Sequence, residues 1–131
     1  MPPSADEDPG LGLAVTAEVL FLANLLVAPG IAFLALIWMR RRYPDVSALA
    51  RCHIDQAFFA SLWSGMLLVV ATGALLALGG LAWKWTWVTV VLYFTCIHST
   101  LILFGVVGLA KAQAGRTYTY PLLGPRGGRS G

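Results

Sequence analysis

Two histidines are the side chains of this sequence with the widest chemical range. His53 stands beside Asp55 at the start of a long apolar run, and His98 lies next to Ser99 inside a later one. Histidine serves as a general base, as a metal ligand or as an axial haem ligand. Each of these chemistries is therefore a hypothesis that the spacing of the residues has to support.

The spacing of the histidines does not favour a shared haem. A b-type haem held between two helices needs an imidazole from each helix at the same depth. Counted from the turn near Lys84, His98 lies about 14 residues along its run and His53 about 31, which differ by roughly 25 Å of helix. We expect no cofactor in this chain alone. A haem-carrying electron-transfer subunit remains a remote alternative that needs a ligand from a partner.

The polar residues that open the second apolar run also lack the pattern of an active site. Arg51 and Asp55 are spaced i, i+4 and can pair on one helix face, whereas His53 and Asp55, two residues apart, face different sides. No nucleophile–base arrangement, phosphate-binding glycine loop or zinc motif is present. Cys52 and Cys96 are too far apart to suggest a redox motif. We predict that the chain is not an enzyme, with no catalytic and no metal-binding residue.

A second group of polar side chains lies within the apolar runs. These intramembrane candidates are Asn24 in the first run and Thr95, His98 and Ser99 in the third. Polar side chains at this depth either form hydrogen bonds between helices or line a proton or substrate path. Glu18 lies in the outer part of the first run, where an interfacial position is expected.

The composition indicates the elements that must position these residues. Of 131 residues, 58% are hydrophobic and 11% are charged, and the mean hydropathy is +0.75, which excludes an ordinary soluble domain. Three apolar runs are long enough to cross a bilayer core of about 30 Å. We predict an all-α integral membrane protein whose three-helix domain covers residues 11–112, with spans at about 11–39, 53–82 and 86–110. Residues 1–10 form an acidic flexible tail and residues 113–131 a basic aromatic one.

The basic residues predict the topology. One side of the predicted membrane carries eight of them and the other side only Lys84, so the N-terminus is expected outside and the C-terminus in the cytoplasm. The calculated pI of about 9.2 is explained by these flanking positions, and no nucleic acid is expected as a partner. The eight are Arg40, Arg41, Arg42, Arg51, Lys111, Arg116, Arg126 and Arg129.

Other residues predict packing and anchoring. Pro29-Gly30 is expected to bend the first span. Small side chains in the second run predict a helix-packing stripe, made of Ser61, Gly65, Thr72 and Gly79. Aromatic and basic residues are typical of the membrane–water interface, and the expected anchors are Trp83, Lys84, Trp85, Trp87, Tyr118 and Tyr120.

Several motifs together resemble a bacterial family. They are Asn24–Pro29 followed by the three arginines, the stretch His53–Phe58, and a terminal Lys-Ala-x-x-Gly-x-x-Tyr-x-Tyr-Pro pattern that ends at Pro121. The chain resembles a family of small uncharacterised bacterial multi-span membrane proteins, distantly grouped with the Tic-twenty membrane subunit of the chloroplast inner-envelope protein translocon. It departs from that family at Gln56–Phe59, where an asparagine is missing. The resemblance implies a translocon-like role only by analogy.

Three helices enclose too little space for a pore, so assembly is the central functional question. The leading hypothesis is a non-enzymatic accessory or structural subunit of a larger complex in the bacterial inner (plasma) membrane. The alternative is a homo-oligomeric channel, transporter or translocon-like component. The expected partners are membrane lipids and either other membrane subunits or copies of the chain itself.

Overall fold

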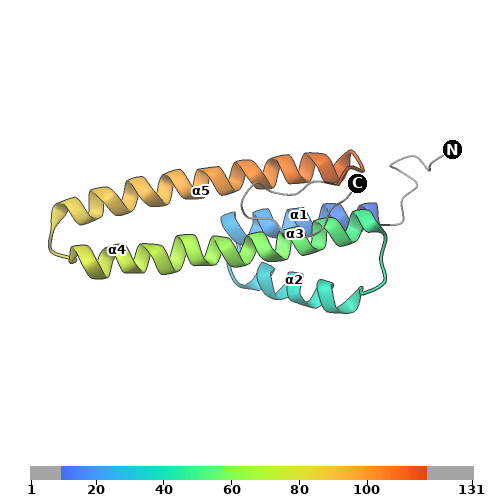
Figure 1. Cartoon of the computed structure of the whole chain (residues 1–131), viewed down its shortest axis with the longest axis horizontal. Helices are drawn as coiled ribbons and strands as arrows, with labels where there is room; N and C mark the ends of the chain where they lie inside the picture. The colour runs from blue at the N-terminus through green and yellow to red at the C-terminus, as the bar shows by residue number, and fades with distance from the viewer. Residues whose placement is uncertain (1–9, 118–131) are drawn as a thin grey trace.

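The chain is helical throughout the part that the structure, a computed structural model, describes, which is residues 10–117 (Figure 1). This confirms the predicted all-α class. The tails predicted for residues 1–10 and 113–131 fall mostly outside the described residues, as do the expected anchors Tyr118 and Tyr120. The helices are α1 (Leu11–Leu26), α2 (Ile31–Arg42), α3 (Ala48–Gly65), α4 (Ala71–Gly79) and α5 (Lys84–Gln113), and a π-helical segment, η2 (Met66–Val70), joins α3 to α4.

Two long antiparallel helices form the frame of the molecule (Figure 1). Ala48–Gly79 is continuous over 32 residues through η2, and α5 has 30 residues. Both are long and apolar enough to cross a membrane, which needs about 20 apolar residues. They correspond to the second and third predicted spans. The chain reverses between them at Gly80, whose φ of 80° favours glycine.

The first apolar run does not form one helix. α1 ends at Leu26 and α2 begins at Ile31, and the connection contains Pro29 and then Gly30 with φ 87°. Proline lacks the amide hydrogen that would continue α1, and glycine adopts the positive φ that reverses the chain. A bend within one helix was expected at Pro29-Gly30, and the structure has a full reversal of the chain there.

The contacts of α3 show this reversal directly. Glu18 of α1 lies 2.6 Å from His53, and Arg40 of α2 lies 3.0 Å from Asp55, two residues further along α3. In one straight helix, Glu18 and Arg40 would be about 33 Å apart. Hence α1 and α2 form an antiparallel hairpin, termed here the α1–α2 hairpin, which packs on one half of the long frame (Figure 1).

The single span predicted for residues 11–39 is therefore wrong for this fold. The 16 residues of α1 and the 12 of α2 extend about 24 Å and 18 Å, less than the bilayer core of about 30 Å. Leu11 also lies at the same end of the bundle as the last residues of α5, since Ala14, Leu49 and Ala112 form one buried cluster. The two ends of the described chain therefore lie at the same end of the bundle, whereas a single helix over residues 11–39 would have separated them.

The reversal is stabilised by side chains that replace missing helical hydrogen bonds. The Gly30 amide donates to Oδ1 of Asn24 at 3.0 Å, and Nε2 of His98 donates to the Leu25 carbonyl at 3.0 Å. Such caps are needed because the last carbonyls of a helix have no partner within the helix. His98 lies near the midpoint of α5, so the hairpin reaches about half the length of the frame.

The π-helical segment is also explained by a contact across the frame. The hydroxyl of Tyr93 on α5 donates to the Leu67 carbonyl at 2.7 Å. A π-helical turn releases carbonyls from the regular i→i+4 pattern, and an added donor compensates for the loss. The wider helix turn at Met66–Val70 thus has an identifiable partner on α5.

Close packing of α1 depends on glycine and alanine. A Cβ added to Gly105 of α5 would lie 2.5 Å from Cδ2 of Leu22 and 3.1 Å from Cδ1 of Phe21. Alanines of α1 and α3 line the facing side, so α1 lies deep between the two long helices. In the other half of the frame, α4 and the start of α5 pack on each other, and outward residues such as Leu78 are up to 89% exposed.

The α1–α2 hairpin predicts a labelling pattern in membranes. In a chain without Cys52 and Cys96, single cysteines are introduced as Gly12→Cys, Asp45→Cys, Gln113→Cys and Lys84→Cys. A membrane-impermeant maleimide should label the first three from one side and Lys84→Cys from the other. Labelling of Gly12→Cys together with Lys84→Cys would restore the three-span arrangement and contradict the hairpin.

Glycine packing predicts a selective loss of stability. Gly105→Val should lower the free energy of unfolding in detergent by about 1–3 kcal/mol, because the added methyls meet Leu22 and Phe21. Gly65→Val is the matched control, since nothing lies within 4 Å of a Cβ built there. Denaturant unfolding followed by tryptophan fluorescence measures both. Equal effects of the two substitutions would contradict the packing of α1 against α5.

Candidate functional site

A cluster of buried polar side chains lies where α1 meets the first turns of α3. Glu18, His53 and Gln56 are each at most 1% exposed. Nδ1 of His53 is 2.6 Å and Nε2 of Gln56 is 3.2 Å from the same oxygen, Oε1 of Glu18. Small side chains on both helices allow this approach, and His53 and Gln56 share a face of α3 because they are three residues apart. We term these three residues the buried polar cluster.

The second nitrogen of the imidazole restricts where protons can be. Nε2 of His53 lies 2.8 Å from the backbone carbonyl oxygen of Arg116, which follows α5. A carbonyl only accepts hydrogen bonds, so Nε2 must carry a hydrogen. At Nδ1 the hydrogen bond then requires either an imidazolium facing a carboxylate or a neutral imidazole facing a protonated carboxyl group. Both arrangements hold one proton between Glu18 and His53, and both are neutral overall.

This neutrality explains how two ionisable groups can be buried together. An isolated charge inside an apolar bundle costs several kcal/mol, about 3–5 when a buried pair loses one partner. The His53–Glu18 contact avoids that cost, and the Gln56 amide orients the carboxyl group. The pair can shift one proton between Nδ1 and Oε1 without changing its net charge. It also joins α1, α3 and the segment after α5 at one level.

Asp55 organises a second, more accessible polar contact on the neighbouring face of α3. Its Oδ1 lies 3.8 Å from Nη1 of Arg51, which confirms the predicted i, i+4 pair, and 3.0 Å from Nε of Arg40. The three side chains are about one quarter to two fifths exposed, so these ion pairs contribute little stability, about 0–1 kcal/mol each. Their structural effect is to join α2 to α3. His53 and Asp55 face different sides, as their spacing predicted.

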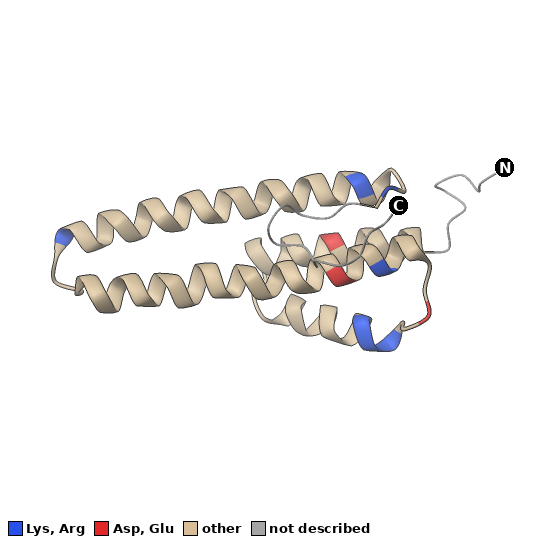
Figure 2. Cartoon of the chain, in the orientation of Figure 1, with Lys and Arg blue, Asp and Glu red and all other residues tan. Residues whose placement is uncertain are grey.

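Charge is distributed very unevenly along the frame (Figure 2). Lys84 stands at the turn that begins α5, and the other charged residues of the described part lie in the half covered by the α1–α2 hairpin. Trp83, Trp85 and Trp87 surround Lys84 and are about half exposed. The Lys84 ammonium lies 5.8 Å from the Trp85 ring, and Nε1 of Trp87 donates to the Leu81 carbonyl. The predicted anchors at the turn are thus exposed at one end of the molecule.

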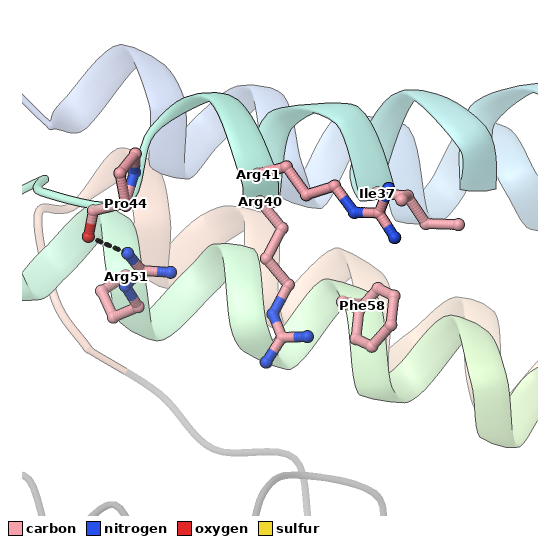
Figure 3. A pocket seen from close by; sticks show the side chains of 6 residues that line it. All are labelled: Ile37, Arg40, Arg41, Pro44, Arg51 and Phe58. Atoms are coloured by element: carbon pink, nitrogen blue, oxygen red, sulfur yellow. Dashed lines mark hydrogen bonds between the residues drawn. The ribbon is translucent and has the colours of Figure 1, made fainter.

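A surface depression lies between α2 and α3 at the charged end (Figure 3). Its volume is about 370 Å³. Figure 3 shows the Arg51 guanidinium hydrogen-bonded to the Pro44 carbonyl. The residues that line it are Ile37, Arg40, Arg41, Pro44, Arg51 and Phe58, and we term this depression the arginine groove.

The structure divides the predicted intramembrane residues into two groups. Asn24 and His98 cap the reversal of the α1–α2 hairpin, so the expected helix-to-helix hydrogen bond of His98 is present and goes to a backbone carbonyl. Thr95 and Ser99 instead lie on the exposed side of α5. The four residues therefore do not line one path within this chain.

The predicted stripe of small residues is also divided. Ser61 is buried, and the hydroxyl oxygens of Ser61 and Thr72 are inaccessible to solvent and have no hydrogen-bond partner among the described residues. A Cβ on Gly79 would lie 2.5 Å from Oγ1 of Thr86, so Gly79 permits close packing of α4 on α5. Gly65 is exposed, with nothing within 4 Å of a Cβ there. Gly105 makes the close approach to α1.

The two histidines lie at different positions in the bundle. His53 contacts α1 at Glu18, and His98 contacts it at Leu25, seven residues or about 10 Å further along the helix. The two imidazoles are thus held by different partners at different levels. Within residues 10–117, no group of three or more histidine, cysteine or acidic side chains is placed to hold a metal ion.

Sequence reasoning missed the buried polar cluster, because it placed Glu18 at the membrane interface and His53 at a polar turn. A partial signal was present: Pro29-Gly30 is compatible with a reversal as well as with a bend, and Asn24 before it is a residue that can cap a reversal. With a reversal there, the lone acid of α1 lies beside the start of the second apolar run. His53 and Gln56 then become its nearest polar partners.

The cluster predicts strong coupling between its members. His53→Leu should lower the free energy of unfolding by about 3–5 kcal/mol, because the Glu18 carboxyl group stays buried without its main partner. The double variant Glu18→Leu/His53→Leu should be more stable than His53→Leu alone. Denaturant titration of the protein in detergent micelles measures each variant.

The matched control is His98→Leu, which removes one hydrogen bond at a half-buried position and should cost about 1 kcal/mol. The loss of unfolding free energy in the double variant is compared with the sum of the losses in Glu18→Leu and His53→Leu. If the two are equal, Glu18 and His53 do not interact energetically. That result would contradict the neutral pair.

Comparison with known proteins adds no relative from which a function could be transferred. No family model, no curated protein and no solved structure matches this chain. Its function has to be argued from its own helices, from the buried polar cluster and from the surfaces that the α1–α2 hairpin leaves exposed.

Proposed function

We propose that this chain is a non-enzymatic integral membrane protein that serves as an accessory or structural subunit of a larger complex in the bacterial inner membrane. In this proposal, Ala48–Gly79 and α5 are the two spans, and the α1–α2 hairpin is re-entrant, entering and leaving on one side. The length and apolar surface of the two long helices support the placement. By the positive-inside rule, the end that carries the arginines faces the cytoplasm.

The re-entrant hairpin fits a membrane because its reversal is capped within the protein. Irregular backbone at membrane depth is tolerated only where its polar groups find partners. Asn24 and His98 supply two of these partners at the tip. The tryptophans around Lys84 then lie at the opposite interface, which is a favourable place for indole rings and a lysine ammonium.

The observation that carries the proposed subunit role is a polar face on the outside of α5. The exposed residues Thr95, Cys96, Ser99 and Thr100 lie about halfway along this helix, and we term them the α5 polar face. Small and hydroxyl side chains at this depth favour contact with another helix over contact with lipid. In the described part of the chain, α1 fills the space between the long helices and encloses the buried polar cluster.

A homo-oligomeric channel, transporter or translocon-like component is the second candidate. It is favoured by the same observation, because two or more copies meeting at the α5 polar face would bring Thr95 and Ser99 together. The buried ionisable pair of Glu18 and His53 is also typical of proton-handling membrane proteins. The family resemblance of the terminal motif supports this candidate by analogy alone.

The test is to isolate the tagged protein from its native membranes in mild detergent and to measure the mass of the intact assemblies. A foreign protein at fixed stoichiometry is the expected result for a subunit. A homo-oligomer without foreign protein would overturn the subunit role in favour of the second candidate. A monomer that carries only lipid would contradict both.

A substitution on the α5 polar face tests the surface itself. Ser99→Phe should reduce retention of the partner about tenfold or more, which corresponds to about 1.4 kcal/mol of lost binding. Leu78→Phe is the control, since Leu78 is exposed on α4 away from this face. Equal retention by the Ser99→Phe variant and the unaltered protein would exclude this face as the contact.

A further inference from the structure

The arginine groove is a surface feature whose positive charge the contacts described so far do not explain. Its walls come from α2, from the start of α3 and from the connection between them (Figure 3). Phe58 stacks on Phe33 at 5.6 Å between ring centroids, and this contact fixes the distance between α2 and α3 below the groove. The depression is therefore built by packed helices.

Positive charge in the groove exceeds what the nearby acids neutralise. Arg40 is held by Asp55 at 3.0 Å and lies over the Phe58 ring, with its guanidinium carbon 4.6 Å from the ring centroid. Arg51 shares the same carboxylate at 3.8 Å and donates to backbone carbonyls of the connection. Arg41 is exposed and makes no ion pair with the described residues. Among residues 10–117, the acid in contact with these arginines is Asp55, so the three leave a net charge of about +2.

The fixed guanidinium groups suit a phosphate. A guanidinium presents several N–H donors in one plane, and it binds phosphate oxygens through paired hydrogen bonds. Arg40 is already oriented by Asp55, so little of its side-chain entropy is lost when an anion binds between it and Arg41. Figure 3 shows Arg40 and Arg41 extending from α2 in different directions, which leaves space between their charged ends.

An apolar extension leads from the groove along α2 toward the membrane interior. A second depression of about 400 Å³ shares Ile37 and Arg41 with the first, and it is also lined by Leu34, Trp38 and Arg42. Leu34 and Trp38 are 65% and 59% exposed. Cationic groups at the surface end and an apolar path toward the hairpin tip match the two chemical parts of a phospholipid.

We propose that the arginine groove binds one anionic phospholipid of the surrounding leaflet. Arg40 and Arg41 contact its phosphate, Arg51 adds positive charge at the Pro44 end of the groove, and an acyl chain lies along Leu34, Ile37 and Trp38. This inference rests on the membrane placement proposed above, though not on the identity of any protein partner. The bound lipid fills the space beside the re-entrant hairpin and holds α2 at the cytoplasmic interface.

Lipid binding to the purified full-length protein tests the proposal. Native mass spectrometry in detergent compares added phosphatidylglycerol with phosphatidylcholine, and one phosphatidylglycerol should be retained preferentially. Arg41→Gln should weaken its retention about fivefold, and a similar factor is expected for each further arginine removed. Since Arg41 is exposed and unpaired by acids among the described residues, this variant is expected to fold.

Two controls separate the groove from general attraction. Lys84→Gln removes a cation at the other end of the bundle, and Lys111→Gln removes one at the same end outside the groove; both should retain the lipid as the unaltered protein does. Equal losses in the Lys111→Gln and Arg41→Gln variants would overturn the proposal, because the attraction would then be diffuse.

The apolar part has its own test. Leu34→Asn should weaken phosphatidylglycerol retention, and millimolar inorganic phosphate should not displace the lipid. Displacement by phosphate would show an anion site without a lipid chain, and equal retention of both phospholipids would remove the anion site. If the protein selects phosphatidylglycerol but no protein partner is isolated from native membranes, the lipid site is upheld and the proposed subunit role fails.

Discussion

A carboxyl group inside an apolar helix bundle must have a partner, and the rest of this structure depends on how Glu18 meets that requirement. His53 provides the partner only if α1 lies against the first turns of α3. The first apolar run also folds back near its middle, so that Arg40 of α2 reaches Asp55 on the neighbouring face of α3. The His53–Glu18 contact thus joins α1 to α3 beside α2. The Arg116 carbonyl, which contacts His53, adds the segment after α5 to the same cluster.

The α1–α2 hairpin makes the two halves of the long frame different from each other. In one half, α1 fills the space between α3 and α5, and hydrogen bonds join the buried side chains of Glu18, His53 and Gln56. In the other half, among residues 10–117, α4 and the start of α5 pack on one another, with a close contact of Gly79 with Thr86. Charged residues gather in the first half and tryptophans at the far turn (Figure 2). This polarity is the basis of the proposed orientation, in which the arginine groove lies at the level of the lipid headgroups.

The proposed subunit role and the proposed lipid site use different surfaces. The α5 polar face lies on the outside of a long helix, and the arginine groove lies between α2 and α3. Neither overlaps the buried polar cluster, whose side chains are enclosed by the bundle. Stability, protein contact and lipid contact are thereby assigned to separate sets of residues. A substitution in one set is expected to leave the other two largely unchanged, since distant sites without shared partners behave additively.

Much of this architecture could be predicted from the amino-acid sequence. Apolar runs of membrane length predicted the two long helices, and the i, i+4 spacing of Arg51 and Asp55 predicted their ion pair. These features are local, because each depends on residues within a few turns of one helix. The hydrogen bond of His98 to another helix was also predictable, since a polar side chain in an apolar run needs a partner.

The tertiary structure alone decided which distant residues meet. A proline–glycine pair is compatible with a bend or with a reversal, and the local sequence does not distinguish them by itself. The choice follows from burial: reversal pairs Glu18 with His53, whereas a straight span would carry Glu18 away from α3. The same reversal of the chain places Leu11 at the end of the bundle that carries the arginines, and it forms the groove between α2 and α3. Contacts between residues 35 positions apart depend on the summed packing of all the helices, which no single segment of the sequence specifies.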